Sequence, residues 1–178
     1  EKLREWLGRF SGYHQQIKQL EKEIDELSWD ASFGMYNSAG LRRKIKECPD
    51  GAEFAMAFLD LDCLHHLNEV YGYHDVNNRI KNSFHYEPVD DKIINRIFSG
   101  DEILVLVKGG IDKLHHLLTR IQRQGIQNKI SFQSTIRQWR KGRDNFDQFL
   151  SEMGRELLNL KKTRVKISRE VNISLASA

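Results

Sequence analysis

The first 27 residues repeat an apolar side chain at alternating steps of three and four, and no other feature restricts the fold of this chain as strongly. The positions in this seam are Leu3, Trp6, Phe10, Tyr13, Ile17, Leu20, Ile24 and Leu27. Such steps mark the a and d positions of a coiled coil. A single helix packed on its own domain would carry a broader apolar stripe, of period about 3.6. The seam favours a two-helix coiled coil over residues 1–28, and a parallel pairing would bring two copies of the following domain side by side.

The composition narrows the class of protein. The chain has 178 residues, enough for one domain beside the stalk. Its net charge of +3 is too small to indicate a nucleic-acid partner, and we interpret the basic segment 137–143 as a solvated loop. No apolar run approaches the roughly 18 residues of a membrane span, and two cysteines, Cys48 and Cys63, make no disulfide framework. We expect a cytoplasmic domain that follows an upstream sensor. This location is also compatible with a full-length protein that is tethered to a membrane.

The residues after Trp29 alternate between helix and strand patterns. Strands are predicted over 54–61, 93–98, 103–107 and 130–136, and helices over 41–46, 64–71 with a resumption after Gly72, 111–124 ending at Gly125, and from an Asp144 N-cap to Leu160. The second and third strands flank a short turn, which predicts a hairpin. This order predicts an α+β fold, with a palm or ferredoxin-like central antiparallel sheet and helices mainly on one face. We expect the domain to span 29–168 and a C-terminal tail to span 169–178.

Four carboxylates are predicted to meet at one edge of the sheet. Asp60 and Asp62 end the most apolar strand, and Asp101 and Glu102 lie in the hairpin turn. If the hairpin lies beside that strand, the acids converge, which is costly unless a cation neutralises them. Hard oxygen ligands suit Mg²⁺, which bridges substrate phosphates. The alternative is that all four are ordinary surface-loop residues.

Three segments resemble the GGDEF domain, the nucleotidyl cyclase module of bacterial cyclic-di-GMP signalling. Residues 30–37, DASFGMYN, are similar to the family's opening D-x-L-T-G-L-Y-N, with Phe33 in place of threonine. Residues 58–78, FLDLDCLHHLNEVYGYHDVNN, are similar to its D-x-D-x-F-K-x-x-N-D-x-x-G-H-x-x-G-D block. Ser99-Gly100-Asp101-Glu102-Ile103 stands where the signature itself belongs. The order and spacing of the segments carry the resemblance, which includes a helical stalk of the kind that joins such domains to sensors.

The resemblance implies a metal-dependent reaction. The family's metal ligands fall on Asp60, Asp101 and the backbone carbonyl of Leu61, and the implied ion is Mg²⁺ or Mn²⁺. Glu102 takes the place of the glutamate that activates the 3′-hydroxyl or stabilises the transition state. The implied reaction condenses two GTP into cyclic di-GMP with loss of two pyrophosphates. Because each copy binds one GTP, two domains must face each other, and the stalk would control that encounter as a homodimer.

Four further positions correspond to residues that hold the nucleotide. Asn68 matches an asparagine that contacts the base, and Lys161 a lysine that holds the triphosphate. Gly100 matches the glycine that lets the backbone approach the phosphate. His65 stands where the family has a phosphate-binding lysine, so a permanent positive charge is lost at neutral pH.

Asn77 replaces an aspartate that reads the guanine edge in the family. A carboxylate accepts from guanine N1–H and the 2-amino group, whereas an amide offers one acceptor and one donor. That pattern suits adenine at least as well, so ATP stands beside GTP as a substrate. The alternative is that Asn77 marks relaxed selection on an inactive site.

The family's inhibitory product site, R-x-x-D, would fall at 90–93, where neither required residue is present, so we expect no inhibitory site. Two hypotheses remain. In the first, the chain is a divergent cyclase, favoured by its intact Asp60, Asp101 and Glu102. In the second, it is an inactive, degenerate GGDEF domain that binds a nucleotide or a protein partner, favoured by His65, Asn77 and the altered signature.

Overall fold

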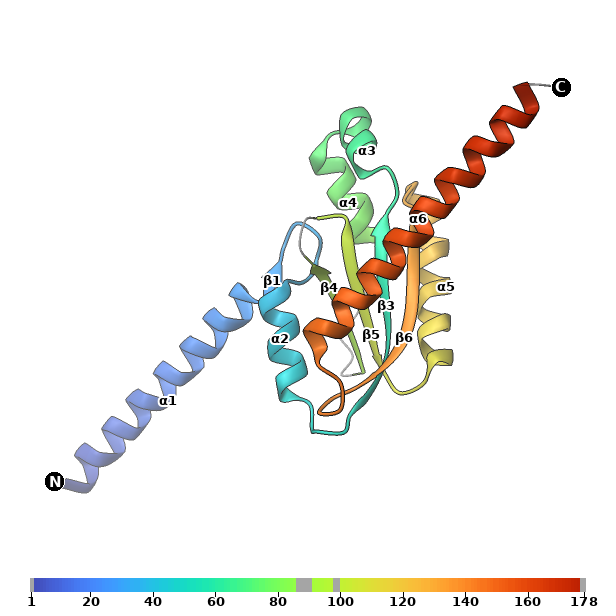
Figure 1. The fold of residues 1–178 in the computed structure, drawn as a ribbon. Helices are drawn as coiled ribbons and strands as arrows, with labels where there is room; N and C mark the ends of the chain where they lie inside the picture. The colour runs from blue at the N-terminus through green and yellow to red at the C-terminus, as the bar shows by residue number, and fades with distance from the viewer. Residues whose placement is uncertain (1, 86–90, 98–99, 177–178) are drawn as a thin grey trace.

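A computed structural model describes residues 2–85, 91–97 and 100–176, which form one sheet, its covering helices and a projecting stalk (Figure 1). The elements in chain order are α1 (Lys2–Leu27), β1 (Trp29–Asp30), β2 (Met35–Tyr36), α2 (Ser38–Glu47), β3 (Glu53–Leu61), α3 (Leu64–Tyr71), α4 (Tyr73–Ser83), β4 (Lys92–Ile97), β5 (Glu102–Lys108), α5 (Ile111–Asn128), β6 (Phe132–Arg140) and α6 (Phe146–Ala176). The predicted α+β class is confirmed. The backbone of α6 continues without a break through residue 168, where we expected a separate tail to follow.

The sheet has the strand order β1-β2-β4-β5-β3-β6. The strands β4, β5, β3 and β6 pair with one another in antiparallel fashion, and β4 and β5 form the predicted hairpin. The strand β3 lies between β5 and β6, and six consecutive residues from Phe54 to Leu59 are buried. An apolar run without alternation indicates a strand covered on both faces, and β3 is such a strand. The short strand β2, which the sequence analysis did not predict, adds to the edge in parallel with β4.

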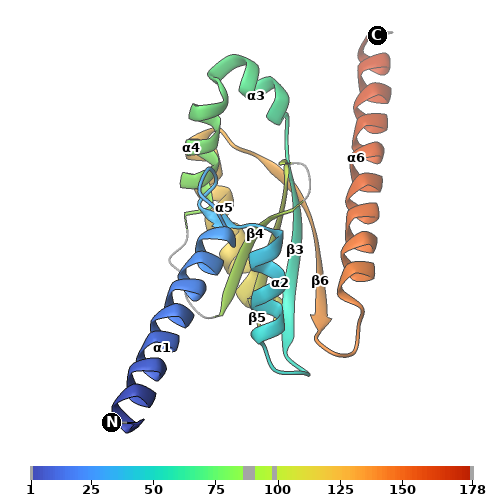
Figure 2. The ribbon, with the colours of Figure 1, turned by 90° about the vertical axis from the view of Figure 1, so that its left-hand side faces the viewer.

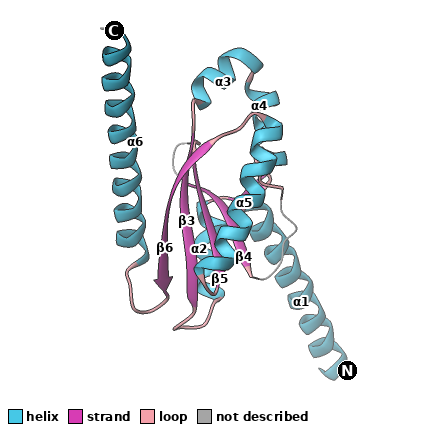
Figure 3. Ribbon diagram, turned by 90° about the vertical axis from the view of Figure 1, so that its right-hand side faces the viewer, coloured by secondary structure: helices cyan, strands magenta, loops and turns pink. Residues whose placement is uncertain are grey.

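Helices cover both faces of the sheet, so the prediction that they lie mainly on one face is wrong. The helices α4 and α5 pack on one face around Leu59, Val105 and Ile121. The helices α2 and α6 pack on the other face around Met56, Leu104 and Met153. Figures 2 and 3 show α5 and α6 on opposite sides of the strands. Successive side chains of a strand point to opposite faces of the sheet. Because consecutive residues of β3 are buried, both faces have to be covered.

The predicted N-terminal helix is confirmed as α1, which projects away from the domain (Figure 1). Its described seam residues, Tyr13, Ile17, Leu20, Ile24 and Leu27, are 46–75% exposed. The pairing of two such helices stays a prediction. None of the described helices is both long and apolar enough to cross a membrane.

The base of α1 is fixed to the domain by polar contacts. The Asn37 side chain donates to the Leu27 carbonyl at 2.7 Å, and its Oδ1 accepts from Gly40 N at 3.0 Å. Asn37 therefore caps α2 and holds the end of α1 at once. An ion pair between Arg43 of α2 and Asp25 of α1 joins the same two helices. These contacts fix the direction in which the stalk leaves the domain.

Two predicted helix ends differ from the structure. The helix α5 continues through Gly125 to Asn128 and ends at Lys129, which has a left-handed backbone. Gly125 is required for packing, since a Cβ there would lie 2.6 Å from the Ile130 carbonyl oxygen. At the start of α6, Asn145 replaces Asp144 as the capping residue, because its Oδ1 accepts from Gln148 N at 3.0 Å.

The predicted basic loop is also wrong in part, because its first residues belong to β6. Trp139 is only 3% exposed and packs on Phe54. Arg137 faces α6, where two glutamates neutralise it. An apolar indole and a paired arginine are core and interface residues of a strand, which a basic composition alone does not reveal.

Candidate active site

The end of β3 carries the acidic cluster. Asp60 lies opposite Glu102 in the antiparallel ladder between β3 and β5. One residue earlier, Asp101 accepts a hydrogen bond from Leu61 N at its backbone carbonyl, at 2.8 Å. The hairpin therefore lies beside β3, and Asp60, Asp101 and Glu102 come together as the sequence predicted. We name these three residues the acidic cluster.

Burial and mutual repulsion disfavour the charged forms of two of these acids. Partial burial raises the pKa of Asp60, and the nearby charges of Asp101 and Asp62 raise it further. Burial is also the largest cause of the raised pKa of Glu102, followed by Asp101 and Asp60. Lys161 opposes the shift at both sites. The acidic cluster is thus a place where added positive charge is favourable.

Lys161 comes from α6 and forms an ion pair with Oδ1 of Asp60. The side chain of Asp60 is 14% exposed and that of Lys161 is 32% exposed, so the pair is partly shielded from water. Sequence spacing gave no reason for this contact, since the residues are far apart in the chain. The resemblance assigned Lys161 to phosphate and Asp60 to metal; the structure joins them to each other.

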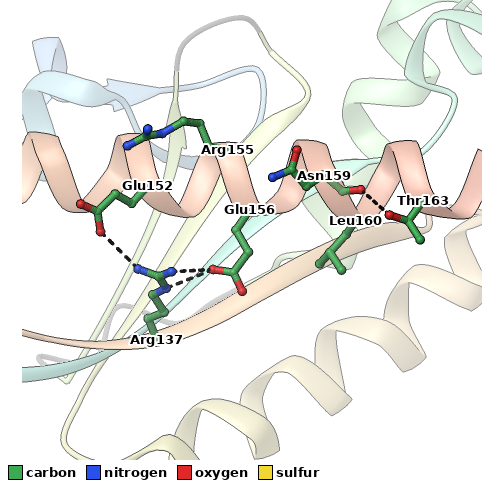
Figure 4. A pocket seen from close by; sticks show the side chains of 7 residues that line it. All are labelled: Arg137, Glu152, Arg155, Glu156, Asn159, Leu160 and Thr163. Carbon is green, nitrogen blue, oxygen red and sulfur yellow. Dashed lines mark hydrogen bonds and ion pairs between the residues drawn. The ribbon is translucent and has the colours of Figure 1, made fainter.

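Side chains that line a groove of about 560 Å³ between α6 and β6 hold α6 in place (Figure 4). Arg137 of β6 lies between two glutamates of α6, 3.3 Å from Glu152 Oε2 and 3.0 Å from Glu156 Oε2. A guanidinium shared by two acids one turn apart fixes both the height and the rotation of a helix. Lys161, somewhat more than one turn after Glu156, is thereby directed to the end of β3.

Asp62 differs from the other acids, and our expectation that four carboxylates converge is corrected to three. Its Oδ2 accepts from the Ser131 hydroxyl at 3.0 Å, and its Oδ1 accepts from the Gln133 amide at 3.1 Å. Both donors are neutral and come from the β6 side. Asp62 acts on Asp60 through its charge alone.

The acidic cluster suits a hard divalent cation that keeps water or substrate oxygens as further ligands. Among the described residues, no group of three or more His, Cys, Asp or Glu side chains is arranged to hold a metal alone. Asp60 and Asp101, with the Leu61 carbonyl, would form the smaller donor set that Mg²⁺ commonly uses with phosphates. The donor chemistry therefore fits the implied ion, although Lys161 occupies Oδ1 of Asp60.

Three of the predicted nucleotide-binding residues, His65, Asn68 and Asn77, belong to α3 and α4, the helices that follow this end of β3 (Figure 2). Oδ1 of Asn68 is buried and accepts no hydrogen bond from the described residues. Asn77 is half-buried in α4. His65 is not directed to the acidic cluster: its side chain is 86% exposed, and its Nε2 lies 3.3 Å from Glu69 of the same helix.

Arg96 is a residue of this site that the sequence analysis missed. Its Nη1 donates to Asp30 Oδ2 at 2.9 Å, and its guanidinium lies 4.0 Å from the centroid of the Phe33 ring. Gly100 has φ of +105°, and a Cβ there would lie 2.5 Å from Arg96 Nη2. Arg96 therefore joins the segment that follows the stalk to the signature turn. The ring of Phe33, a residue that departs from the family pattern, packs against the Arg96 guanidinium. The spacing of Asp30 and Arg96 gave no signal, because the pair forms only when β2 aligns with β4.

Several predicted positions fall outside the described residues. Ser99 is one of them, and so is Asp90, the first position of the absent inhibitory motif. At its last position, Ile93 is a buried residue of β4, 6% exposed.

Comparison with known proteins places the fold. No protein-family model matches the sequence, and no curated protein matches it. Among solved structures, diguanylate cyclase SiaD from Pseudomonas aeruginosa, crystallised with its activator SiaC, matches with a TM-score of 0.65 at 19% identity over 89% of this chain and 68% of that one. The coiled coil and GGDEF domain of DgcB from Caulobacter crescentus, bound to c-di-GMP, matches with a TM-score of 0.62 at 14% identity over 88% of this chain and 94% of that one. A microbial GGDEF domain described with cyclic di-GMP matches at 0.59 and 18% identity over 80% of this chain and 92% of that one. This chain therefore has the fold of GGDEF domains.

The Arg96 contacts predict a large effect on stability. Arg96→Ala removes a partly buried ion pair and a cation–π contact and leaves Oδ2 of Asp30 without its charged partner, while Oδ1 keeps its bonds from the backbone N–H groups of Ser32 and Phe33. We therefore expect a loss of about 2–3 kcal/mol in the free energy of unfolding. Arg42→Ala is the matched control, since the side chains of Arg42 and Asp147 are 65% and 63% exposed. For that pair we expect less than about 1 kcal/mol. Urea denaturation measures both, and equal losses would contradict the prediction.

The raised pKa of Glu102 predicts a dependence of stability on pH. Because the folded protein holds this proton more tightly than the unfolded chain, Glu102 lowers the free energy of unfolding as pH rises above the ordinary value of 4.5. We expect Glu102→Gln to unfold at higher urea concentration than the wild type at pH 7, and the difference to shrink towards pH 4. Glu21→Gln, on the exposed surface of α1, is the control. A difference that does not change with pH would count against the prediction.

Proposed function

We propose that this chain is a divergent GGDEF nucleotidyl cyclase, which condenses two GTP into cyclic di-GMP with Mg²⁺ or Mn²⁺ and releases pyrophosphate. The observation that carries the proposal is the ladder position of Asp60 opposite Glu102, with Asp101 one residue away, at the buried end of the central strand. Acids are costly to gather there, and a cation with bound phosphates compensates for that cost. The same arrangement on a GGDEF fold supports phosphoryl transfer over a structural role.

The residues divide into roles around the reacting hydroxyl and phosphate. Asp60, Asp101 and the Leu61 carbonyl would hold the metal, which supplies charge stabilisation at the phosphate. Glu102 would activate the 3′-hydroxyl that attacks the α-phosphate of the second nucleotide, as pyrophosphate leaves. Its raised pKa brings it closer to the range in which a carboxylate accepts a proton efficiently. Lys161 and Gly100 would serve the phosphates.

The base would bind between α3 and α4. The buried Oδ1 of Asn68 accepts no hydrogen bond from the described residues and so suits a donor on a purine. His65 is a weaker candidate for phosphate binding, because it is paired with Glu69 at the surface.

Each domain would supply half of the reaction, so activity requires two chains. The exposed heptad seam of α1 is the surface that would pair them. An upstream sensor acting through this helix would set the approach of the two domains.

The second candidate function is an inactive nucleotide- or partner-binding module that relays a signal. Two observations favour this binding module: His65 lies at the surface beside Glu69 and away from the acidic cluster, and residue 77 is an amide in place of the family's aspartate. The intact acidic cluster favours the enzyme.

Incubation of the protein with GTP, ATP and both together distinguishes the candidates. We expect a cyclic dinucleotide, detected by mass, in the presence of Mg²⁺ or Mn²⁺ and at concentrations where the chain is dimeric. Asp60→Asn should abolish the product, because the acidic cluster loses the charge of a metal ligand. Asp112→Asn, at an exposed position of α5, should leave the product unchanged. If no mixture gives a cyclic product, the chain is the binding module.

The residue at position 77 predicts base choice. Asn77→Asp restores a carboxylate that accepts from both guanine donors, so we expect the ratio of GTP to ATP consumption to rise by about tenfold, the value of one good hydrogen bond to a charged group. Asn78→Asp, one residue along α4 and exposed, is the matched control. An unchanged ratio would show that Asn77 does not read the base.

A further inference from the structure

The ion pair between Lys161 and Asp60 has a consequence for metal binding. Lys161 contacts the same carboxylate that the proposed function assigns to the metal. Two cations on one carboxylate oxygen repel each other strongly when they are shielded from water. Asp60 is largely buried, so the contact with Lys161 and the coordination of a metal at Oδ1 exclude each other.

The surroundings make Lys161 the local counter-charge of the acidic cluster. Asp60 and Glu102 face each other across the ladder, and Asp101 acts on both. Asp62 receives its hydrogen bonds from the neutral donors Ser131 and Gln133. Among the residues that the structure describes, Lys161 is a cation that acts favourably on both Asp60 and Glu102.

The position of Lys161 is built into the fold. Leu157, four residues before it, is buried against the sheet, and Arg137 holds the preceding turns of α6 through Glu152 and Glu156. The backbone of Lys161 therefore stays in place, while its four-carbon side chain is free to change partners. An exchange of partners requires movement of the side chain alone.

We propose that Lys161 is the resting counter-ion of Asp60 and that it has to leave this carboxylate before a divalent metal binds there. A triphosphate that attracts the ammonium then opens the metal position, so that nucleotide and metal promote each other's binding. Without nucleotide, the ion pair holds the metal affinity low. The inference rests on the proposed function, since it takes Asp60 as a metal ligand.

Binding of Mn²⁺ to the nucleotide-free protein tests this directly, without any turnover. Titration followed by electron paramagnetic resonance gives the affinity for the wild type, Lys161→Met and Lys162→Met. Methionine keeps the length of the lysine stem and removes its charge. We expect Lys161→Met to bind Mn²⁺ about tenfold more tightly than the wild type. Lys162→Met, an exposed neighbour with the same loss of net charge, should change the affinity less than about twofold.

A second titration measures the coupling with nucleotide. In the wild type, a non-hydrolysable GTP analogue should tighten Mn²⁺ binding more than it does in Lys161→Met, because only the wild type has an ion pair to open. Thermal unfolding of each variant establishes that it is folded.

The outcomes separate this inference from the proposed function. If the wild type binds Mn²⁺ through Asp60, as shown by loss in Asp60→Asn, but Lys161→Met equals the wild type or Lys162→Met, the counter-ion role is overturned and the metal site stands. If no variant binds Mn²⁺ with or without nucleotide, both proposals fall.

Discussion

The gathering of three carboxylates at the end of a buried strand is the constraint on which the rest of the structure depends. Asp60 occupies the end of β3, where its neighbours on either side are strands and its backbone cannot shift. The β5 register then brings Glu102 and Asp101 beside it. A fold that places like charges there has to supply positive charge, and α6 supplies it through Lys161.

The cover on both faces of the sheet makes that geometry rigid. The two apolar layers fix β3 from either side, so the acidic cluster is built on a strand and not on a loop. The signature turn and α6 are held by the same kind of interaction, in which an arginine of the sheet forms an ion pair with another element. Arg137 joins β6 to α6, and Arg96 joins the base of the stalk to the hairpin. Both α6 and the signature turn are therefore held in position by arginines of the same sheet.

The sequence predicted the elements better than their environment. The apolar run at β3, the hairpin and the interruption at Gly72 were all readable, because hydrophobic period and turn residues act locally. The order of elements predicts helices mainly on one face, whereas the unbroken apolar run of β3 requires cover on both faces. Because glycine is a common helix stop, the sequence predicts a helix end at Gly125, but the close approach of the Ile130 carbonyl that requires this glycine is a tertiary contact. The basic residues around Trp139 predict a solvated loop, whereas the burial of its indole depends on contacts with distant residues such as Phe54.

The sequence by itself determined the acids, the stalk seam and the order of the helices and the four long strands, since each is encoded in residue type and spacing along the chain. Only the tertiary structure decided which charges compensate each other. It paired Asp62 with the neutral donors Ser131 and Gln133, His65 with Glu69, and Lys161 with Asp60. Pairings of this kind depend on how distant segments are brought together when the sheet closes and α6 docks on it. Short-range spacing does not contain that information.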